Sequence, residues 1–237
     1  MTEAVGAQEI GHTHRDVSGG WLRPAVFGAM DGLVTNIALV AGVGGAGADH
    51  GVIVLSGVAG LVAGAFSMAL GEYASVETQN DSVRAEAAVE RAEIARNPRA
   101  EQAELADMYV EMGLTRKTAE LVAEEVHADE ELAVKVHVTQ ELGVDPDEQP
   151  SPLAAGVSSF LCFSVGALFP LIPYLLGFSS LLAGLAVGGV GLFAAGAVAA
   201  RFTTRPWWLG GLRQLMFGAI GAGATYLVGS LIGVTTS

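Results

Sequence analysis

The sequence has little charge for its length, and in long stretches it has none. Only 16% of its 237 residues are charged, which is less than the surface of a soluble protein of this size requires. No Asp, Glu, Lys or Arg occurs from Gln149 to Ala200, and no Lys or Arg occurs between Arg23 and Arg84. These stretches are long enough for helices that cross a bilayer. The composition therefore predicts a membrane protein.

Other absences exclude classes of function. The single cysteine, Cys162, excludes an intrachain disulfide and a zinc site built from cysteines. The net charge of −13 argues against a nucleic-acid partner, because phosphate binding needs a basic surface. The sequence contains no nucleophile triad, no phosphate-binding glycine loop and no dinucleotide fingerprint. We therefore expect neither an enzyme nor an ATP-driven pump.

The apolar residues form five candidate membrane spans. Each is about 20 residues or longer, the length that a helix needs to cross the hydrocarbon core. Glycine and alanine dominate them, and small residues let helices pack closely within a membrane. Pro170 and Pro173 predict a kink in the third span, because proline removes a backbone hydrogen bond. The fold class is thus an all-α membrane protein with spans over residues 24–46, 52–74, 152–176, 181–200 and 209–233.

Basic residues indicate how these spans are oriented. All twelve Lys and Arg residues fall in segments that five spans place on one side, and the opposite loops, 47–51 and 177–180, contain none. Because the side rich in Lys and Arg is usually cytoplasmic, we expect a cytoplasmic N-terminus and a C-terminus outside. The first 22 residues have no apolar core of a signal peptide. We therefore expect a multi-pass protein of a bacterial plasma membrane.

A separate acidic segment lies between the second and third spans. Residues 77–148 contain 19 of the 25 acidic residues. Residues 75–96 contain no Gly or Pro, so we expect the second span to continue as one helix into the cytoplasm. Asn97-Pro98 ends this helix, and shorter helices follow over about 99–112, from Thr115 to Val126, and up to Leu142. The predicted domains are a cytoplasmic tail (1–22), spans one and two (23–75), a cytoplasmic helical metal-binding module (76–150) and spans three to five (151–237).

One carboxylate lies inside the first span. Asp31 is costly at membrane depth, and intramembrane acids usually serve ion or proton passage. In the second span Met68 and Glu72 lie four residues apart and share a helix face. A thioether beside carboxylates favours a transition metal, because sulfur is a soft ligand. We interpret Asp31, Met68 and Glu72 as a transport pathway. The alternatives are that Met68 fills a packing gap and that Glu72 faces interfacial water.

Carboxylates recur at helical spacing in the module. The pattern Glu-x-x-Glu occurs at 90–93 and at 101–104, on two helices joined by the Asn97-Pro98 turn. Folded as a hairpin, these helices would bring four carboxylates together, a set that suits divalent iron or manganese. A solvated, salt-bridged face is the alternative for the first helix, and core packing is the alternative for the methionine. The predicted ligands on the two helices are Glu86, Glu90, Glu93, Glu101, Glu104 and Met108.

Histidines add a second kind of ligand. His137 and Glu141 lie four residues apart, and we predict both as metal ligands. Glu124-x-x-His127 matches the di-iron signature of ferritin-like bundles. Those bundles need a second copy, however, and Val134 stands three residues before His137. We therefore expect His127 to be a peripheral residue.

Three motifs together resemble the vacuolar iron transporter family. They are Asp31-Gly32-Leu33-Val34, Ser67-Met68-Ala69-Leu70-Gly71-Glu72-Tyr73 and Pro170-Leu171-Ile172-Pro173-Tyr174. The similarity covers about residues 20–235, including the five spans and the helical insert after the second. It implies export of ferrous iron, and often manganese, from the cytosol in exchange for protons. It also implies a homodimer with the pathway between the two subunits.

The resemblance assigns individual residues as well. The family's pathway residues match Asp31 and Met68, its two cytoplasmic Glu-x-x-Glu pairs match 90–93 and 101–104, and its closing glutamate matches Glu141. Two positions depart from the plant-type pattern. That pattern has a membrane glutamate where this chain has Gly60, with Glu72 as a candidate substitute. It also has paired methionines where this chain has His137-Val138, and the histidine shifts the expected preference among iron, manganese and zinc.

These observations predict a divalent transition-metal transporter that exports Fe²⁺ or Mn²⁺ by proton antiport. Zn²⁺ is a further ion that the module would bind. The module gathers the ion, the ion passes to Asp31 and Met68, and protons then bind the vacated carboxylates, since desolvation favours the neutral acid. The alternative is a membrane-anchored metal sensor or assembly protein whose acidic module binds a partner. A third possibility is a membrane ferritin-like oxidase.

Overall fold

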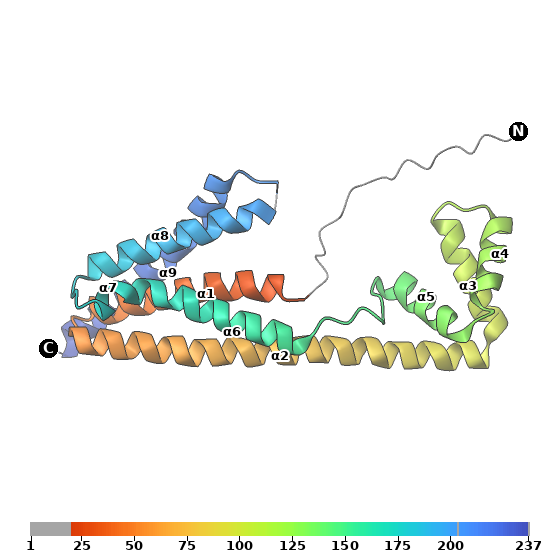
Figure 1. Ribbon diagram of the computed structural model, residues 1–237, viewed down its shortest axis with the longest axis horizontal. Coiled ribbons are helices and arrows are strands. Elements are labelled where there is room, and N and C mark those ends of the chain that lie inside the picture. The colour runs from red at the N-terminus through yellow and green to blue at the C-terminus, as the bar shows by residue number, and fades with distance from the viewer. Residues whose placement is uncertain (1–19, 203, 237) are drawn as a thin grey trace, which may run out of the picture.

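Residues 20–202 and 204–236 are described by this computed structural model, and all their regular secondary structure is helical. Figure 1 shows a bundle of apolar helices and a smaller helical group, joined by one long helix and by a linker. Of the predicted tail, residues 1–22, only residues 20–22 lie within the described part. The fold class predicted from the sequence is confirmed.

Within the described part of the chain, five helical segments are long and apolar enough to cross a membrane. Together they confirm the predicted spans, so the chain is an integral, multi-pass membrane protein. The helices that form them are α1 (Leu22–Gly45), α2 (His50–Arg96), α6 (Pro152–Leu168), α8 (Leu181–Ala199) and α9 (Trp207–Thr236). A short 3-10 turn, η2 (Ala200–Phe202), follows α8.

The third span is interrupted near its C-terminal end, where the sequence has two prolines. The helix α6 passes into a 3-10 turn, η1 (Phe169–Leu171), and then into the single turn α7 (Ile172–Leu175). Proline lacks the N–H group that continues the α-helical hydrogen-bond ladder. The prolines at 170 and 173 are both buried, so the interruption packs within the bundle.

Glycines allow α1 and α6 to touch along their backbones. A Cβ atom at Gly28 would lie 2.7 Å from the carbonyl oxygen of Ser159, and one at Gly32 would collide with the carbonyl oxygen of Phe163. Such close approach is typical of membrane helices, where packing rather than the hydrophobic effect drives association. The centre of the bundle is therefore the α1–α6 pair, with α2 on one side of α6.

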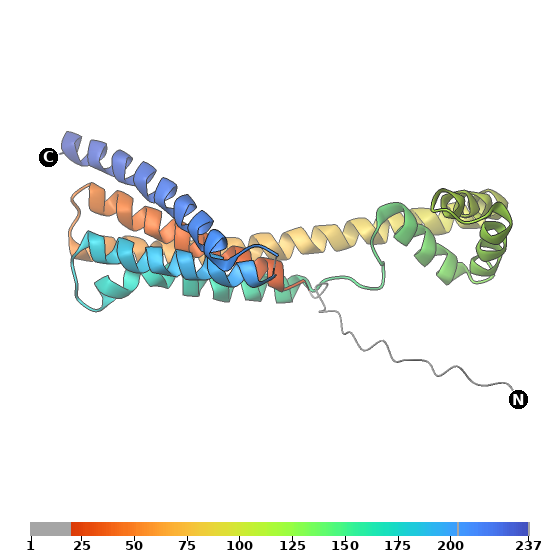
Figure 2. The same ribbon diagram turned by 90° about the horizontal axis from the view of Figure 1, so that it is seen from above.

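The helix α2 belongs to both parts of the molecule. It has 47 residues, which at about 1.5 Å per residue makes it roughly 70 Å long. Asp49 caps its start by accepting a hydrogen bond from the backbone N–H of Val52 at 2.9 Å, and the Asn97-Pro98 pair ends it as predicted. Its apolar first half, residues 50–74, lies in the bundle, and the remainder extends past it (Figures 1 and 2). This remainder is rich in charged residues, so we expect it to lie outside the hydrocarbon core.

Three short helices follow α2 at its far end. They are α3 (Pro98–Glu111), α4 (Arg116–Val126) and α5 (Glu130–Leu142). The side chains of Leu105 and Ala106 on α3 pack with Ala119 and Ala123 on α4. The residues predicted to begin and end these helices do so. Thr115 caps α4, and Gly143 ends α5 with a φ of 69°, a conformation that favours glycine. We refer to the far end of α2 together with α3–α5 as the acidic module.

The helix α5 joins the acidic module to α2. Ile94 of α2 packs with Ala133, Val134 and Val138 of α5 in a small apolar cluster. Outside this cluster, Arg91 pairs with Glu131 at 2.6 Å. Exposed ion pairs contribute little to stability, so the apolar cluster supplies most of the stabilisation between α2 and α5.

Candidate metal centre

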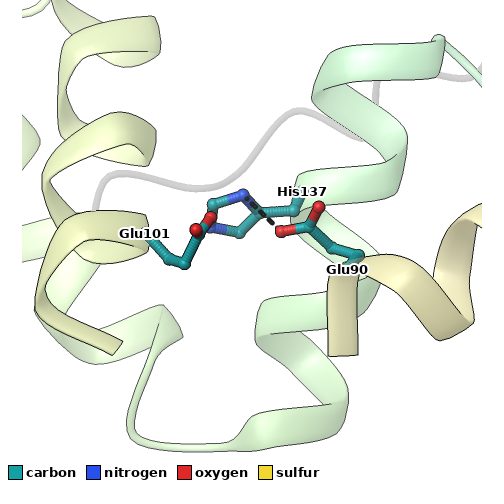
Figure 3. Close-up of side chains that lie close together, drawn as sticks. All are labelled: Glu90, Glu101 and His137. Atoms are coloured by element: carbon teal, nitrogen blue, oxygen red, sulfur yellow. Dashed lines mark ion pairs between the residues drawn. The ribbon is translucent and has the colours of Figure 1, made fainter. Parts of the chain in front are cut away.

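Three helices of the acidic module bring two carboxylates and one imidazole together. Glu90 lies on α2, Glu101 on the first turn of α3 and His137 on α5. Each offers one ligand atom, and these atoms lie within 4.8 Å of one another. In Figure 3 the two carboxylates approach the His137 ring from opposite sides. The sequence predicted all three as ligands, and the fold makes them neighbours.

The local sequence explains why these side chains converge. Glu90 lies one helical turn before Ile94, whose apolar contact with α5 fixes that face of α2. The Asn97-Pro98 turn then redirects the chain, so that α3 stands across the end of α2 (Figures 1 and 2) and Glu101 in its first turn lies close to Glu90. His137 lies beside Val138 and Val134, which pack against Ile94. The apolar contacts thus place the polar ligands.

His137 is completely buried, and one of its ring nitrogens faces acids. Its Nδ1 atom lies 3.1 Å from Oε1 of Glu90 and 3.4 Å from Oε1 of Glu141. The Glu90 oxygen is buried, and despite this distance it makes no well-aligned hydrogen bond within the described residues. A buried acceptor left in this state is costly. The arrangement therefore has an oxygen atom available for a cation.

The carboxyl groups of this cluster hold protons more tightly than ordinary glutamates. Burial raises the pKa of Glu90, and the charges of Glu141, Glu101 and Glu104 raise it further, while His137 opposes them. Burial also raises the pKa of Glu101, with Glu104 as the next largest cause. Carboxylates forced together without a cation repel each other. A divalent ion could replace the protons, because its positive charge would offset the repulsion between the ionised carboxylates.

The donor set suits a divalent transition ion. Carboxylate oxygens suit Mn²⁺ and Fe²⁺, and an imidazole nitrogen adds affinity for Fe²⁺ and Zn²⁺. In a transporter such an ion is cargo rather than a resident cofactor. The residues that could hold such an ion are Glu90, Glu101 and His137, with Glu141 at the edge.

The other predicted ligands have different surroundings. Glu93 pairs with Arg96 at 2.8 Å, and Glu86 is exposed on α2. Met108 packs against the apolar core between α3 and α4, which is the packing alternative considered for it. Glu104 is exposed and acts on the cluster through its charge. Ligation by these four residues stays a prediction.

The sequence did not identify His127 as part of this site. The residue is half-buried, and its Nε2 atom lies 3.1 Å from Nε2 of His137. The two rings meet edge to face, with centroids 5.2 Å apart and planes at 84°. His127 caps the end of α4, and α5 turns back beside it after three residues. The signal was the short connection between α4 and α5, which folds these histidines onto each other.

The predicted pathway residues lie in the helical bundle. Asp31 is partly buried on α1, and its carboxylate accepts a hydrogen bond from the hydroxyl of Thr35 at 3.4 Å. Met68 packs beside Ala65, against Phe163 of α6. Glu72 lies one turn farther along α2 and is partly buried. The joint role of these residues in ion passage stays a prediction.

A buried amide lies near the glycine that departs from the family pattern. Asn36 is 1% exposed, and its NH₂ group donates hydrogen bonds to the carbonyl oxygens of Gly57, at 3.2 Å, and Ala167, at 2.6 Å. These two bonds orient the side chain. Its oxygen atom has no hydrogen-bond partner among the described residues, and it lies 3.2 Å from the point where a Cβ atom would stand at Gly60.

Comparison with known proteins agrees with the motifs. A family model described as the VIT family matches residues 22–230. The vacuolar iron transporter of Acanthamoeba castellanii is 36% identical over 234 residues, which cover 93% of this chain and 83% of the relative. Vacuolar iron transporter 1 of Oryza sativa subsp. japonica is 28% identical over 212 residues, covering 88% and 84%. Vacuolar iron transporter 1 of Arabidopsis thaliana is 27% identical over 228 residues, covering 93% and 90%. The chain therefore belongs to the VIT family.

Proposed function

We propose that this protein carries Fe²⁺ or Mn²⁺ out of the cytosol across its membrane in exchange for protons. Membership of the VIT family and the names of its relatives as vacuolar iron transporters support metal transport. The single observation that carries the proposal is the convergence of Glu90, Glu101 and His137 from three helices. Such a set of donors at the end of a helix that enters the membrane suits capture of an ion for transport.

The first step of the proposal is capture by the acidic module. A divalent ion replaces the protons that the crowded carboxyls hold, because its charge removes their mutual repulsion. Nineteen of the 25 acidic residues of the chain lie in residues 77–148, so the segment attracts cations over a distance set by the ionic strength. The module thus raises the local ion concentration at the entrance.

The second step is passage through the membrane. Asp31 supplies a carboxylate and Met68 a thioether, a pair that suits Fe²⁺ better than Ca²⁺ or Mg²⁺. A carboxylate vacated by the ion takes up a proton, since a charged acid at membrane depth is unfavourable. Glu72 lies one turn from Met68 on α2 and is a candidate proton carrier. Asp31 is only partly buried within one chain, so a homodimer that encloses it is part of the proposal.

The proposal also includes an orientation. The loop between α1 and α2 and the loop between α7 and α8 contain no Lys or Arg, whereas the acidic module and the loop at 201–205 contain several. By the positive-inside rule the module faces the cytosol. The net direction of transport is then set by the proton gradient across whichever membrane holds the protein.

Reconstituted protein tests this function. Purified protein in liposomes with an acidic interior should take up Fe²⁺ or Mn²⁺, and Asp31→Ala should lower this flux at least about tenfold, because the ion loses a charged partner in the membrane. Asp31→Ala with undiminished flux would remove Asp31 from the pathway. Wild-type protein with no flux for any ion in the series would favour a membrane-anchored sensor or assembly protein instead.

A further inference from the structure

The contact between His127 and His137 restricts which of their ring nitrogens can carry a proton. Two ring nitrogens 3.1 Å apart form a hydrogen bond only when one carries the proton and the other presents a lone pair. His127 is the residue that caps the end of α4 and His137 lies on α5, and their rings meet edge to face. This orientation directs the nitrogen edge of one ring toward the other. The pair is therefore a defined hydrogen bond between side chains rather than two solvated histidines.

Two of the acids around His137 favour Nδ1 as the nitrogen that faces the ion. The oxygens of Glu90 and Glu141 lie at Nδ1, at 3.1 and 3.4 Å. His127 lies at the other nitrogen, Nε2. An imidazole that binds a metal through Nδ1 is neutral and carries its remaining proton at Nε2. That proton needs an acceptor, because His137 is completely buried.

We propose that His127 is the positioning residue of the metal centre: its Nε2 accepts the hydrogen bond from Nε2–H of His137 and holds the His137 ring with Nδ1 toward the ion. The inference rests on the proposed capture of metal by the acidic module. Histidines that bind metals usually donate their second ring N–H to a fixed acceptor, which sets both the tautomer and the ring orientation. A carboxylate or a carbonyl oxygen commonly has this role, and here a second imidazole has it.

The position of His127 gives the acceptor a fixed place. Its backbone N–H donates to the carbonyl oxygen of Ala123 at 3.0 Å as it caps α4, and Ala123 is buried in the core between α3 and α4. His127 is therefore held by the same helices that place Glu101. A change at His127 should disturb the ring of His137 without removing any ligand from the ion.

A spectroscopic metal titration of the full-length protein in detergent tests this inference. Co²⁺ is the probe, because its absorption bands report the number and kind of its ligands. The variants are His127→Ala, His127→Gln and, as the matched control, Glu124→Gln, which changes an exposed residue on the same helix. Glutamine presents an oxygen acceptor at nearly the same reach as the imidazole nitrogen.

We expect His127→Ala to weaken Co²⁺ binding by about 10- to 100-fold, as changes to the partners of ligating histidines do. The positions of the absorption bands and the number of bound ions should stay those of the wild type, because the ligands remain. His127→Gln should recover most of the affinity, and Glu124→Gln should bind like the wild type. Thermal unfolding of each metal-free variant shows whether the module has kept its fold.

Several outcomes would overturn the inference. Shifted absorption bands in His127→Ala, with the fold intact, would make His127 a direct ligand. Wild-type affinity in His127→Ala would show that His127 does not position the ring of His137. Failure of His127→Gln to recover affinity, in a folded protein, would exclude the acceptor function. A wild-type protein that binds no Co²⁺, Mn²⁺ or Zn²⁺ would instead remove the capture role, and the inference with it.

Discussion

The amide oxygen of Asn36 on α1 lies 3.2 Å from the point that a Cβ atom would occupy at Gly60 on α2. The same oxygen is buried and has no hydrogen-bond partner in the described part of the chain. A buried acceptor in this state costs about 1–3 kcal/mol. The chain thus presents an unsatisfied oxygen at the position where the plant-type relatives are expected to have a membrane carboxyl group.

Gly60→Glu should therefore be tolerated and should change proton coupling. When protonated, the new carboxyl can donate its O–H to the Asn36 oxygen, and the Leu39 side chain, whose Cδ1 lies 2.8 Å from the Cβ position, is flexible enough to move. We expect Fe²⁺ flux in liposomes to depend more steeply on the proton gradient than in the wild type, because one more proton-binding group joins the pathway. Gly71→Ala on the same helix, whose Cβ position has open space apart from its chain neighbours and its own helix backbone, should leave the dependence unchanged. Equal gradient dependence in Gly60→Glu and the wild type would contradict this account.

The metal centre predicts different effects for two glutamates of the acidic segment. Glu101→Gln should weaken Mn²⁺ or Zn²⁺ binding by at least about tenfold, because the loss of a ligand costs no less than the loss of a ligand's partner. Glu86→Gln should weaken binding less than this, since its side chain is exposed on α2 and lies outside the cluster of Glu90, Glu101 and His137. Calorimetric titration of the full-length protein measures both. Equal losses in the two variants would show that the segment binds ions by its overall charge.

The raised pKa values of Glu90 and Glu101, caused first by burial, predict the sign of a pH effect. The unfolded chain ionises these groups at the ordinary pKa, before the folded chain does. The contribution of these two carboxyls to the free energy of unfolding is fully present below the ordinary pKa. It is lost as pH rises through the raised pKa values. The metal-free wild type should therefore lose more thermal stability between about pH 5 and about pH 7.5 than Glu90→Gln plus Glu101→Gln does.

Metal binding should show the opposite trend with pH. Protons compete with the ion for these carboxylates, so the affinity for Mn²⁺ should fall as pH falls through the raised pKa values. Titrations at several pH values measure this dependence, and the double glutamine variant is the control. Affinity that is independent of pH would place the ion elsewhere in the chain.

The close contact of α1 and α6 predicts a large cost for one added methyl group. Gly32→Ala would place a Cβ atom against the backbone of α6, 2.9 Å from the nitrogen of Ala167, and a backbone cannot rotate away as a side chain can. We expect a loss of at least about 1–3 kcal/mol, seen as earlier aggregation on heating in detergent. Gly71→Ala should be neutral or slightly stabilising, because alanine favours the helix.

Orientation can be measured with single cysteines. In a Cys162→Ala background, Ser179→Cys in the exposed loop before α8 should react with a membrane-impermeant maleimide added to intact cells. Ala103→Cys on the exposed face of α3 should react only after the membrane is opened. The opposite pattern would invert the orientation that the basic residues predict.

The sequence predicted the helices well because their ends depend on local chemistry. Asn97-Pro98 stops α2 because of the steric restriction on the residue before proline. Thr115 accepts from the backbone at the start of α4, and Gly143 takes the left-handed conformation at the end of α5. Each of these signals is contained in a few neighbouring residues. The five spans follow in the same way from continuous apolar stretches.

The site was less predictable because its geometry depends on how separate helices face each other. Spacing placed Glu90 and Glu93 on nearly the same stripe of α2, yet Glu90 lies beside His137 while Glu93 pairs with Arg96. His127 was expected to be peripheral, and it contacts His137 only because α5 turns back along the end of α4. The packing of Ile94 against α5 decides these outcomes, and a single sequence does not specify that register.

The continuity of α2 has a mechanical consequence. From residue 74 to Glu90 the helix extends about 24 Å beyond the bundle, at about 1.5 Å per residue. With no Gly or Pro between residues 75 and 96, the segment lacks the usual sites of bending. A tilt of about 10° in the span would swing Glu90 through about 4 Å, which is longer than any bond between a ligand and Fe²⁺. The helix would then work as a lever with one arm in the membrane path and the other arm carrying the cargo.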